Sequence, residues 1–424
     1  MKRPIRRAPF ARLSWEGRGD FKITPAPLEI WSRTAPRQAS RNFVENRLIQ
    51  ADNLGAMASL LPELEGKIDL IYIDPPFLTG KAYHARIGRG EDSRQPDTWQ
   101  DGGQYLNMLF PRLELMHRLL ADTGSLYLHL DWHASAYARV LLDELFGPDR
   151  LLNEIVWTYH GPSPIRSAFN RKHDTILVYT KSRDYTFNAD DIRVPYNNST
   201  VKTFASSDKA GFGKQPDLAR GKVPEDWWYF PVVARLHSER TGYPTQKPEA
   251  LLERIIKASS NPGDLVADFF AGSGTTALVA ERLGRCWISC DPAPLAALTT
   301  YRRLQLAGNR PALSWMIDAE HPPLPELKLD VHARRNKADI QVELTGVEVE
   351  GSAGFKFPGD VALWEIDGSA TEPCFHSQAQ IIRGFRSEDI HLKASLPADQ
   401  IIGQVIRVRA FDILGRYGSA SIQL

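Results

Sequence analysis

The sequence predicts an α/β fold in which helices cover both faces of a mostly parallel sheet, with an inserted region and a C-terminal all-β domain. Three observations predict it. Short apolar runs alternate with segments whose apolar residues recur every three or four positions. Residues 181–240 are polar and interrupt that alternation. After the proline-rich stretch 321–330 the helical period disappears, and short alternating segments are separated by glycine turns.

The first half of the α/β pattern predicts strands at 47–50, 68–73, 125–130, 153–159 and 174–181. It predicts helices at 53–61, 105–120 and 135–147. In the helix 105–120 the apolar residues recur on one face, and Asp122-Thr-Gly is expected to end it before the next strand. The second half, after residue 241, reads helix, strand, glycine loop, helix, strand and helix.

Five segments follow from this pattern. Residues 1–40 form a basic arm, 41–160 carry the first half of the sheet, 161–240 are an insertion, 241–320 carry the second half, and 325–424 form the β-rich domain. Residues 1–50 have a net charge of +7 and residues 321–424 a net charge of −3, although the whole chain has only +1. A basic front is compatible with a polyanionic partner.

The composition, 42% hydrophobic and 24% charged, is that of a globular protein with a sizeable core. We find no apolar run of about 18 residues, so no membrane span is expected, and the basic N-terminus lacks the apolar core of a signal peptide. Three cysteines are too few for a disulfide framework. No metal site is expected, because Cys286 and Cys290 have no neighbouring His. The cytoplasm is therefore the expected compartment.

A glycine loop follows one predicted strand, in the stretch DLVADFFAGSGTT. Gly272 and Gly274 lack a Cβ atom and let a ligand approach the backbone closely, and the following helix offers its N-terminal amides. Asp291 ends the next strand, 19 residues after Gly272. A carboxylate at that position can accept hydrogen bonds from ribose hydroxyls.

Several interpretations of this loop compete. A phosphate loop of the Walker type needs a Lys near its end, and Thr275 and Thr276 stand there instead. A dinucleotide fingerprint needs a third small residue, which is Ala277 here. A nucleoside ligand without a pyrophosphate, such as S-adenosylmethionine, makes fewer demands. The loop alone leaves the last two ligands and a plain tight turn open.

The stretch IYIDPPF ends another predicted strand on a carboxylate, two prolines and an aromatic ring. The amino group of adenine or cytosine is a poor nucleophile because its lone pair is delocalised into the ring. Asp74 and the carbonyl group of Pro75 can accept its two N–H bonds and localise that lone pair. The prolines remove competing backbone donors, and Phe77 can stack on a base extruded from the duplex. A strand end with a core phenylalanine is the alternative.

The two motifs together resemble those of the site-specific DNA amino-methyltransferases, the adenine-N6 and cytosine-N4 group. The catalytic motif precedes the donor motif, which is the order of the beta class, and the chain is similar to the modification subunits of type III restriction systems. The similarity spans residues 45–305 and includes ADNL (51–54), NEIVW (153–157) and PTQKP (244–248). It implies a Rossmann-like, S-adenosylmethionine-dependent methyltransferase sheet.

The resemblance also implies residue roles. The catalytic residues would be Asp74, Pro75, Pro76 and Phe77. Gly272 and Gly274 would line the methionine part of the donor, Asp291 its ribose, and Asp52 its adenine, while Thr245 and Lys247 would lie near its carboxylate. The full implied cofactor-binding set is Asp52, Thr245, Lys247, Asp268, Phe270, Ala271, Gly272, Ser273, Gly274 and Asp291. As alternatives, Asp52 is a helix N-cap and Thr245–Pro248 a helix N-terminus.

The sequence departs from the family pattern at three places. Phe77 stands where Tyr is usual, Leu78 where Asn is frequent, and DFFAGSG where DPFCGSG is more usual. Stacking on a base survives the first change, but a hydroxyl contact is lost. None of the three removes a group that the chemistry requires.

Double-stranded DNA is the implied partner, and the resemblance is compatible with a homodimer and with a separate restriction subunit. The loop after Phe77 is expected to close over a flipped nucleotide, and residues 161–240, with a net charge of +4, occupy the position of the family's target-recognition region. Phosphate contacts are expected from basic residues of both segments, namely Lys81, Arg86, Arg89, Arg94, Arg166 and Arg171.

The acid at the head of the catalytic motif favours adenine over cytosine, because many cytosine enzymes carry Ser there. Three other functions compete: cytosine-N4 methylation, RNA methylation, for which Asn in place of Asp74 is common, and a DNA-binding subunit that has lost catalysis. The presence of Asp74, Gly272, Gly274 and Asp291 argues against the last.

Overall fold

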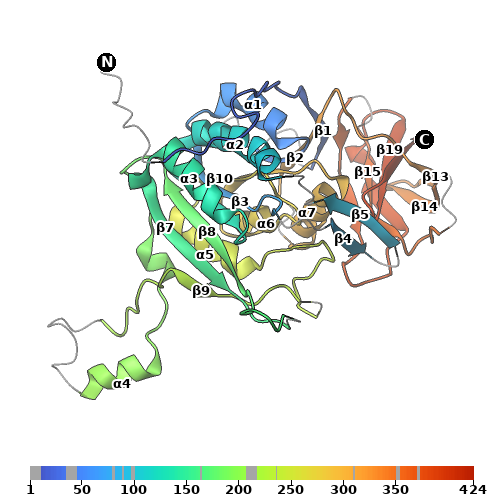
Figure 1. The fold of residues 1–424 in the computed structure, drawn as a ribbon. Coiled ribbons are helices and arrows are strands. Elements are labelled where there is room, and N and C mark those ends of the chain that lie inside the picture. The colour runs from blue at the N-terminus through green and yellow to red at the C-terminus, as the bar shows by residue number, and fades with distance from the viewer. Residues whose placement is uncertain are drawn as a thin grey trace.

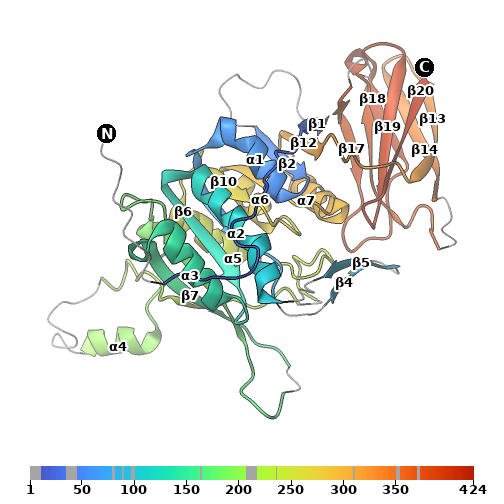
Figure 2. The same cartoon turned by 45° about the horizontal axis from the view of Figure 1, so that its top comes forward.

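The computed structural model describes residues 11–34, 45–78, 82–87, 90–96, 101–162, 165–206, 217–234, 236–308, 311–349, 354–369 and 373–424, with the backbone alone at 82–87, 90–96 and 205–206. These residues form a large α/β body and a β-rich C-terminal lobe, which Figure 2 shows standing beside it. No helix within the described ranges is both long and apolar enough to span a bilayer.

The large sheet has the strand order β16-β1-β12-β2-β11-β10-β3-β6-β8-β7-β9. The six strands from β12 to β6 are parallel, and β8 lies antiparallel between β6 and β7. The bounds are β1 (Leu28–Arg33), β2 (Asn46–Gln50), β3 (Ile68–Ile73), β6 (Leu120–Leu130), β7 (Leu151–Thr158), β8 (His173–Thr180), β9 (Trp227–Tyr229), β10 (Leu265–Asp268), β11 (Cys286–Cys290), β12 (Leu313–Asp318) and β16 (Phe375–His376).

Helices cover both faces of this sheet, as Figure 1 shows. Side chains alternate along a strand, so Ile71 and Ile73 of β3 belong to the core beneath α1–α3, while Leu70 and Tyr72 belong to the core beneath α5–α7. The helices are α1 (Asn53–Leu64), α2 (Gly102–Leu119), α3 (Ser135–Phe146), α5 (Glu249–Ser259), α6 (Thr275–Arg282) and α7 (Pro294–Leu306), with short turns η1 (Pro148–Arg150), η2 (Ala189–Ile192) and η3 (Ala398–Gln400).

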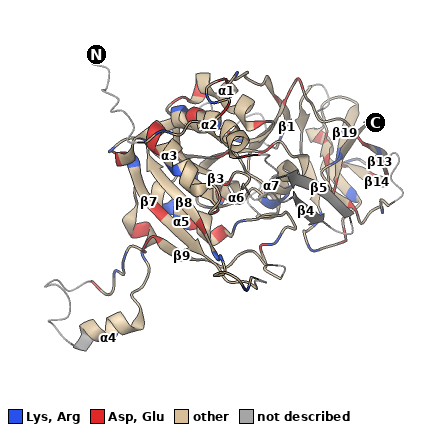
Figure 3. Ribbon diagram, in the orientation of Figure 1, with Lys and Arg blue, Asp and Glu red and all other residues tan. Residues whose placement is uncertain are grey.

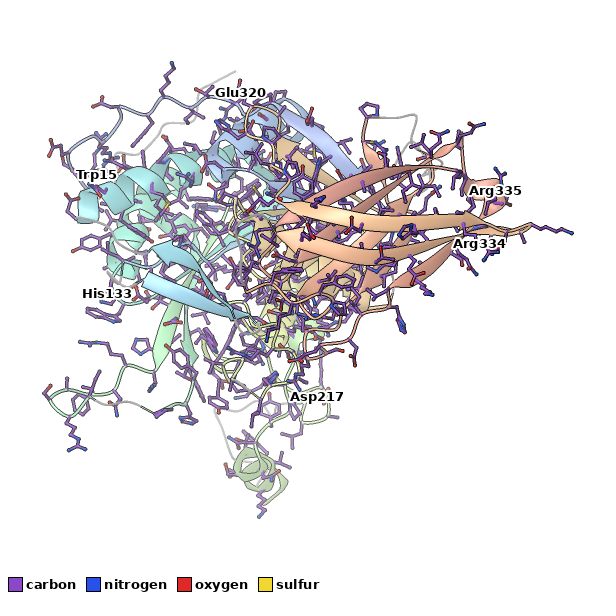
Figure 4. All side chains as sticks on the ribbon, turned by 90° about the vertical axis from the view of Figure 1, so that its right-hand side faces the viewer. Trp15, His133, Asp217, Glu320, Arg334 and Arg335 are labelled. Carbon is purple, nitrogen blue, oxygen red and sulfur yellow. The ribbon has the colours of Figure 1, made fainter. Side chains whose placement is uncertain are left out.

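The C-terminal lobe consists of two antiparallel sheets that share one apolar core. One sheet contains β13 (Leu327–Arg335), β14 (Asp339–Val349) and β18 (Lys393–Pro397), and the other contains β17 (Ala379–Ile382), β15 (Val361–Asp367), β19 (Val405–Asp412) and β20 (Tyr417–Gln423). Arg334 and Arg335 project from its far end (Figure 4). The predicted α/β fold with a C-terminal all-β domain is therefore confirmed.

At three predicted boundaries, the large sheet includes strands from the neighbouring segment. β1 lies inside the segment read as a basic arm, yet it pairs with β12. β8 and β9 lie inside the segment read as an insertion, yet both pair with β7 in the sheet. What leaves the sheet is the polar stretch between β8 and β9, including α4 (Asn198–Ser206), which projects from the body in Figure 1. The strand β8 was predicted at 174–181, although the segment bounds placed it in the insertion. Polarity alone did not reveal β1, which lies near a sheet edge, or β9, which is very short and lies at the other edge.

The predicted break at Asp122-Thr-Gly is wrong, because β6 already begins at Leu120. Leu120 pairs with Ile68, and the register shifts before Leu70 pairs with Ser125. The three residues thus form an irregularity within the strand. After Phe77 the chain forms a two-stranded hairpin, β4 (Ala82–Ile87) and β5 (Gly90–Pro96).

Candidate active site

The predicted catalytic and donor motifs lie side by side because β3, β10 and β11 are parallel neighbours. Asp74 follows β3, the glycine loop follows β10, and Asp291 follows β11. Carboxyl ends of parallel strands are the usual place for α/β sites. There they surround a cavity of about 750 Å³, and every predicted catalytic and cofactor-binding residue lines it except Gly274.

The two oxygens of the Asp74 carboxylate have different surroundings. Its Oδ2 atom accepts a hydrogen bond from the Lys247 ammonium group, whereas its Oδ1 atom is buried and has no hydrogen-bond partner among the described residues. The same ammonium nitrogen lies 5.5 Å from the centre of the Phe77 ring. Lys247, which the resemblance placed near the donor carboxylate, therefore contacts both ends of the catalytic motif.

The glycine loop has two glycines with different functions. Gly272 has φ +49°, and its N–H donates to Asp291 Oδ2 at 2.9 Å, so it lies at the cavity wall. Gly274 has φ +72° and precedes α6, and a Cβ atom there would lie 2.3 Å from Oγ1 of Thr300. Gly274 is thus required for close packing of the loop on α7 and does not line the cavity.

Two buried carboxyl groups hold the loops after β10 and β11. Asp268 accepts hydrogen bonds from Thr276 Oγ1 at 2.6 Å and from the Phe270 N–H at 3.0 Å. Burial, together with the charges of Asp74 and Asp291, raises the pKa of Asp268 to about 7, although the hydrogen bonds from Thr276 and Phe270 act in the opposite direction. Burial likewise raises the pKa of Asp291 to about 6.

The motif ADNL joins α1 to the donor loop. Asp52 accepts hydrogen bonds from the N–H groups of Leu54 and Gly55, so the N-cap interpretation is right, and it also lines the cavity, paired with Arg112 at 2.7 Å. Asn53, which the sequence analysis did not single out, is buried and donates to the carbonyl oxygen of Phe269 at 2.6 Å. One motif thus provides both a helix cap and a wall of the cavity.

The segment Thr245–Lys247 is held by its surroundings. Gln246 Oε1 accepts from Thr241 N–H at 3.0 Å, and its Nε2 donates to Glu239 O at 2.7 Å. Thr245 has φ +55°, a left-handed conformation that costs a β-branched residue energy. The segment lies just before α5, so it is both a helix approach and part of the cavity wall.

A buried polar chain beside Asp74 was missed. The Tyr72 hydroxyl and His129 Nδ1 are 2.8 Å apart, and His129 Nε2 lies 3.4 Å from Asp174 Oδ2. Burial would raise the pKa of Asp174, but the hydrogen bond and charge of His129 outweigh it, so the pKa is lowered. Period-2 spacing could have revealed Tyr72, because it lies two residues before Asp74 on one strand face.

The predicted DNA contacts are only partly described. Lys81 and Arg89 lie outside the described residues, and Arg86 and Arg94 lie in β4 and β5, whose side chains are outside them too. Arg166 and Arg171 are exposed, in the segment between β7 and β8. The Arg171 guanidinium lies 4.2 Å from the centre of the Trp132 ring. Basic and acidic residues are interspersed over the described ribbon (Figure 3).

A family model described as DNA methylase matches residues 68–296, which is more than half of the chain and contains the catalytic turn, the segment Thr245–Lys247, the glycine loop and Asp291. The chain belongs to this N6/N4 DNA methylase family. The resemblance inferred from the order of the two motifs is thereby confirmed.

Members of the N6/N4 DNA methylase family with similar sequences include DNA adenine methyltransferase YhdJ of Escherichia coli (strain K12), 33% identical over 266 residues, which cover 62% of this chain and 83% of YhdJ. Type II methyltransferase M.BglII of Bacillus subtilis is 32% identical over 275 residues, covering 62% and 71%. A solved structure, a putative DNA modification methylase from Thermus thermophilus complexed with S-adenosyl-L-methionine, shares 20% identity over 65% of this chain and 100% of that one, with a TM-score of 0.44.

Proposed function

We propose that this DNA methylase transfers a methyl group from S-adenosylmethionine to the N6 amino group of an adenine that is flipped out of double-stranded DNA at a specific sequence. The observation that carries the proposal is the buried Asp74 Oδ1 atom without a partner among the described residues. A buried acceptor left unpaired is costly, and an incoming N–H group would remove that cost. Pro75, which has no N–H of its own, follows directly with its carbonyl group.

The cavity suits the methyl donor in size and charge. Its volume of about 750 Å³ is that of a pocket for a small molecule. Five carboxylic side chains and three basic ones line it, which favours a sulfonium cation. Gly272 forms part of the cavity wall and has the Tyr243 ring packed directly on its backbone, because a Cβ atom there would lie only 3.2 Å from Tyr243 Cε1.

The chemistry divides between the donor and the chain. When bound, S-adenosylmethionine supplies a methyl group already activated by its sulfonium centre. Asp74 and the Pro75 carbonyl accept the two N–H bonds of the adenine amino group and localise its lone pair, which raises its nucleophilicity. Asp74 can then take the proton that the methylated nitrogen loses. Phe77 stacks on the extruded base and keeps it at the reaction distance.

Adenine is favoured over cytosine by the acid at the head of the catalytic turn. The name of the YhdJ relative, a DNA adenine methyltransferase, supports the same choice. Asp291 and Asp52 would bind the ribose and adenine of the donor, since both line the cavity on the side of the glycine loop. Sequence specificity is assigned to the region between β8 and β9 together with the β7–β8 loop, which carry exposed basic and aromatic residues.

A transfer assay tests this proposal. The protein is incubated with S-adenosylmethionine labelled in its methyl group and with mixed-sequence duplex DNA, which is then digested to nucleosides. Labelled N6-methyl-2′-deoxyadenosine is expected. Labelled N4-methyl-2′-deoxycytidine would instead show that the target base is cytosine. Asp74→Ala should abolish transfer yet still bind the donor, and Asp149→Ala, on the exposed surface, should retain both. Transfer by the Asp74 variant would refute the assignment.

A further inference from the structure

The Lys247 ammonium group lies on Asp74 Oδ2, on the same carboxylate as the Oδ1 atom to which the proposed function directs the target amino group. Its ammonium nitrogen donates to Asp74 Oδ2 and lies 5.5 Å from the centre of the Phe77 ring. A flipped adenine would contact the same two residues, because its amino group would donate to the carboxylate and its ring would stack on Phe77. The Lys247 side chain is only 11% exposed, so it fills the site from within.

The Lys247 ammonium in that position opposes catalysis. It uses one of the two Asp74 oxygens, and its positive charge beside Asp74 opposes the positive charge that develops on the attacking nitrogen. Although Asp74 Oδ1 stays available to the amino group, full activation of the attacking nitrogen therefore needs the ammonium to leave.

The backbone around Lys247 is fixed while its side chain projects into the cavity. The carbonyl oxygen of Lys247 accepts from Thr275 Oγ1 at 3.2 Å, and Gln246 is bound on both sides. The strained Thr245 lies two residues before it. Because the main chain is held, departure of the ammonium requires only rotation about side-chain bonds, which is a small and fast movement.

The other carboxylates of the cavity already have partners. Asp52 is paired with Arg112, Asp174 is hydrogen-bonded to His129 and Tyr159, and Asp291 accepts two backbone N–H groups. The oxygens of Asp268 accept from Thr276 and Phe270. The methyl donor brings a further carboxylate, on its methionine end, and a lysine on a flexible stem can follow it.

We propose that Lys247 holds the base site in the donor-free enzyme and that the methionine carboxylate of the donor draws it away from Asp74. Donor binding then removes the competing positive charge from the base site, so the donor binds before the flipped base. The inference rests on the proposed function in taking S-adenosylmethionine as the donor, and it adds a positioning residue that couples the two binding sites.

This coupling can be measured without DNA. Asp74 and the carboxylate of the donor compete for the Lys247 ammonium group, so each must weaken the binding of the other to Lys247 by the same factor. If Asp74 holds Lys247 against the donor, removing the charge of Asp74 must tighten donor binding. Removing Lys247 must weaken it, and must also abolish the effect of the Asp74 change. The affinity for a ligand that lacks the methionine carboxylate must not change when Asp74 or Lys247 is substituted.

The experiment is a double-mutant cycle by isothermal titration calorimetry with the full chain. The variants are Asp74→Asn, Lys247→Met and the double variant, with Lys257→Met on the outer side of α5 as the matched control. The ligands are S-adenosylhomocysteine, which cannot react, and 5′-deoxy-5′-methylthioadenosine, which has no carboxylate. Melting curves establish that each variant is folded, and Lys247→Gln replaces Lys247→Met if that variant is not.

We expect Lys247→Met to weaken S-adenosylhomocysteine binding about tenfold and Asp74→Asn to tighten it severalfold. The double variant should match Lys247→Met, and methylthioadenosine should bind all variants alike. Tightening by Asp74→Asn that persists without Lys247 would mean direct repulsion of the donor by Asp74 and would overturn the inference, as would no tightening at all. If the unmodified protein bound neither ligand, the proposed function itself would fail, which is a different result.

Discussion

The side-chain amide of Asn53 donates a hydrogen bond to the carbonyl oxygen of Phe269, at 2.6 Å, so the start of α1 is joined to the turn that follows β10. Asn53 also accepts from the Arg112 guanidinium, whose other nitrogen holds Asp52. The catalytic half and the donor half of the sheet are thereby connected across the cavity.

Asn53→Ala should therefore lower both stability and donor affinity. It leaves a buried carbonyl group without its donor, which costs about 1–3 kcal/mol of unfolding free energy. Urea unfolding and S-adenosylhomocysteine titration measure the two effects. Asn336→Ala, an exposed asparagine in the C-terminal lobe, is the control and should change neither. An unchanged unfolding free energy in the Asn53 variant would mean that the hydrogen bond contributes nothing.

Comparing substitutions at Gly274 and Gly284 separates two contributions to the loss of stability, namely backbone strain and steric overlap. Both have φ +72°, but a Cβ atom on Gly274 would lie 2.3 Å from Thr300 Oγ1, whereas one on Gly284 would have no atom within 4 Å. Gly284→Ala should cost about 1 kcal/mol, the conformational term, and Gly274→Ala about 1–3 kcal/mol more, since α7 must shift. Equal melting temperatures for the two variants would contradict the packing function of Gly274.

Asp268→Asn should stabilise the protein, and more so at high pH. Burial raises the pKa of Asp268 to about 7, so between about pH 4 and pH 7 the folded state binds a proton that the unfolded state releases. Stability falls as pH rises through that window, by an amount on the order of a few kcal/mol. Asparagine has no charge and can still accept from the Phe270 N–H through its Oδ1 atom, while its Nδ2 group would donate to Thr276 Oγ1 instead of accepting from it. Thermal melting at pH 5 and pH 8 should show the larger gain at pH 8, and the reverse order would refute the assignment.

Phe77 lacks the hydroxyl group that the family usually has at this position. If its function is to stack on the base, Phe77→Tyr should retain the transfer rate, while Phe77→Ala should lower kcat/KM about 10- to 100-fold, since stacking contributes about 1–3 kcal/mol per base. Phe77→Leu keeps the bulk but not the ring and should resemble alanine more than tyrosine. A fully active Phe77→Ala variant would assign the ring to core packing.

The sequence alone predicted the motifs that meet, because the ends of strands 68–73, 265–268 and 286–290 carry an acid or a glycine loop. Parallel pairing then brings Asp74, Gly272 and Asp291 to one edge of the sheet. It did not predict the partner of Lys247, since 173 residues separate it from Asp74 and no local pattern encodes that contact. Nor did it predict His129, whose place in an apolar strand reads as core until Tyr72 and Asp174 are seen beside it.

The domain boundaries were harder to predict because strand membership depends on neighbours far along the chain. The six residues of β1 are too few to show a clear alternation of polar and apolar side chains. β1 is a strand because β12, nearly 300 residues later, pairs with it. β9 is only three residues long, and it is likewise a strand because it pairs with β7.

The short strand β16 has a consequence for how the molecule behaves at high concentration. It pairs with the outer side of β1 at Ser32 and Arg33, where the large sheet would otherwise end in unpaired main-chain groups. Beside it, Trp31 packs edge-on against Phe411 and Tyr417 of the C-terminal lobe. Open strand edges recruit other chains into aggregates. The C-terminal lobe thus covers an edge of the large sheet that would otherwise promote aggregation. A variant without the lobe would expose the unpaired edge of β1 and the Trp31 side chain.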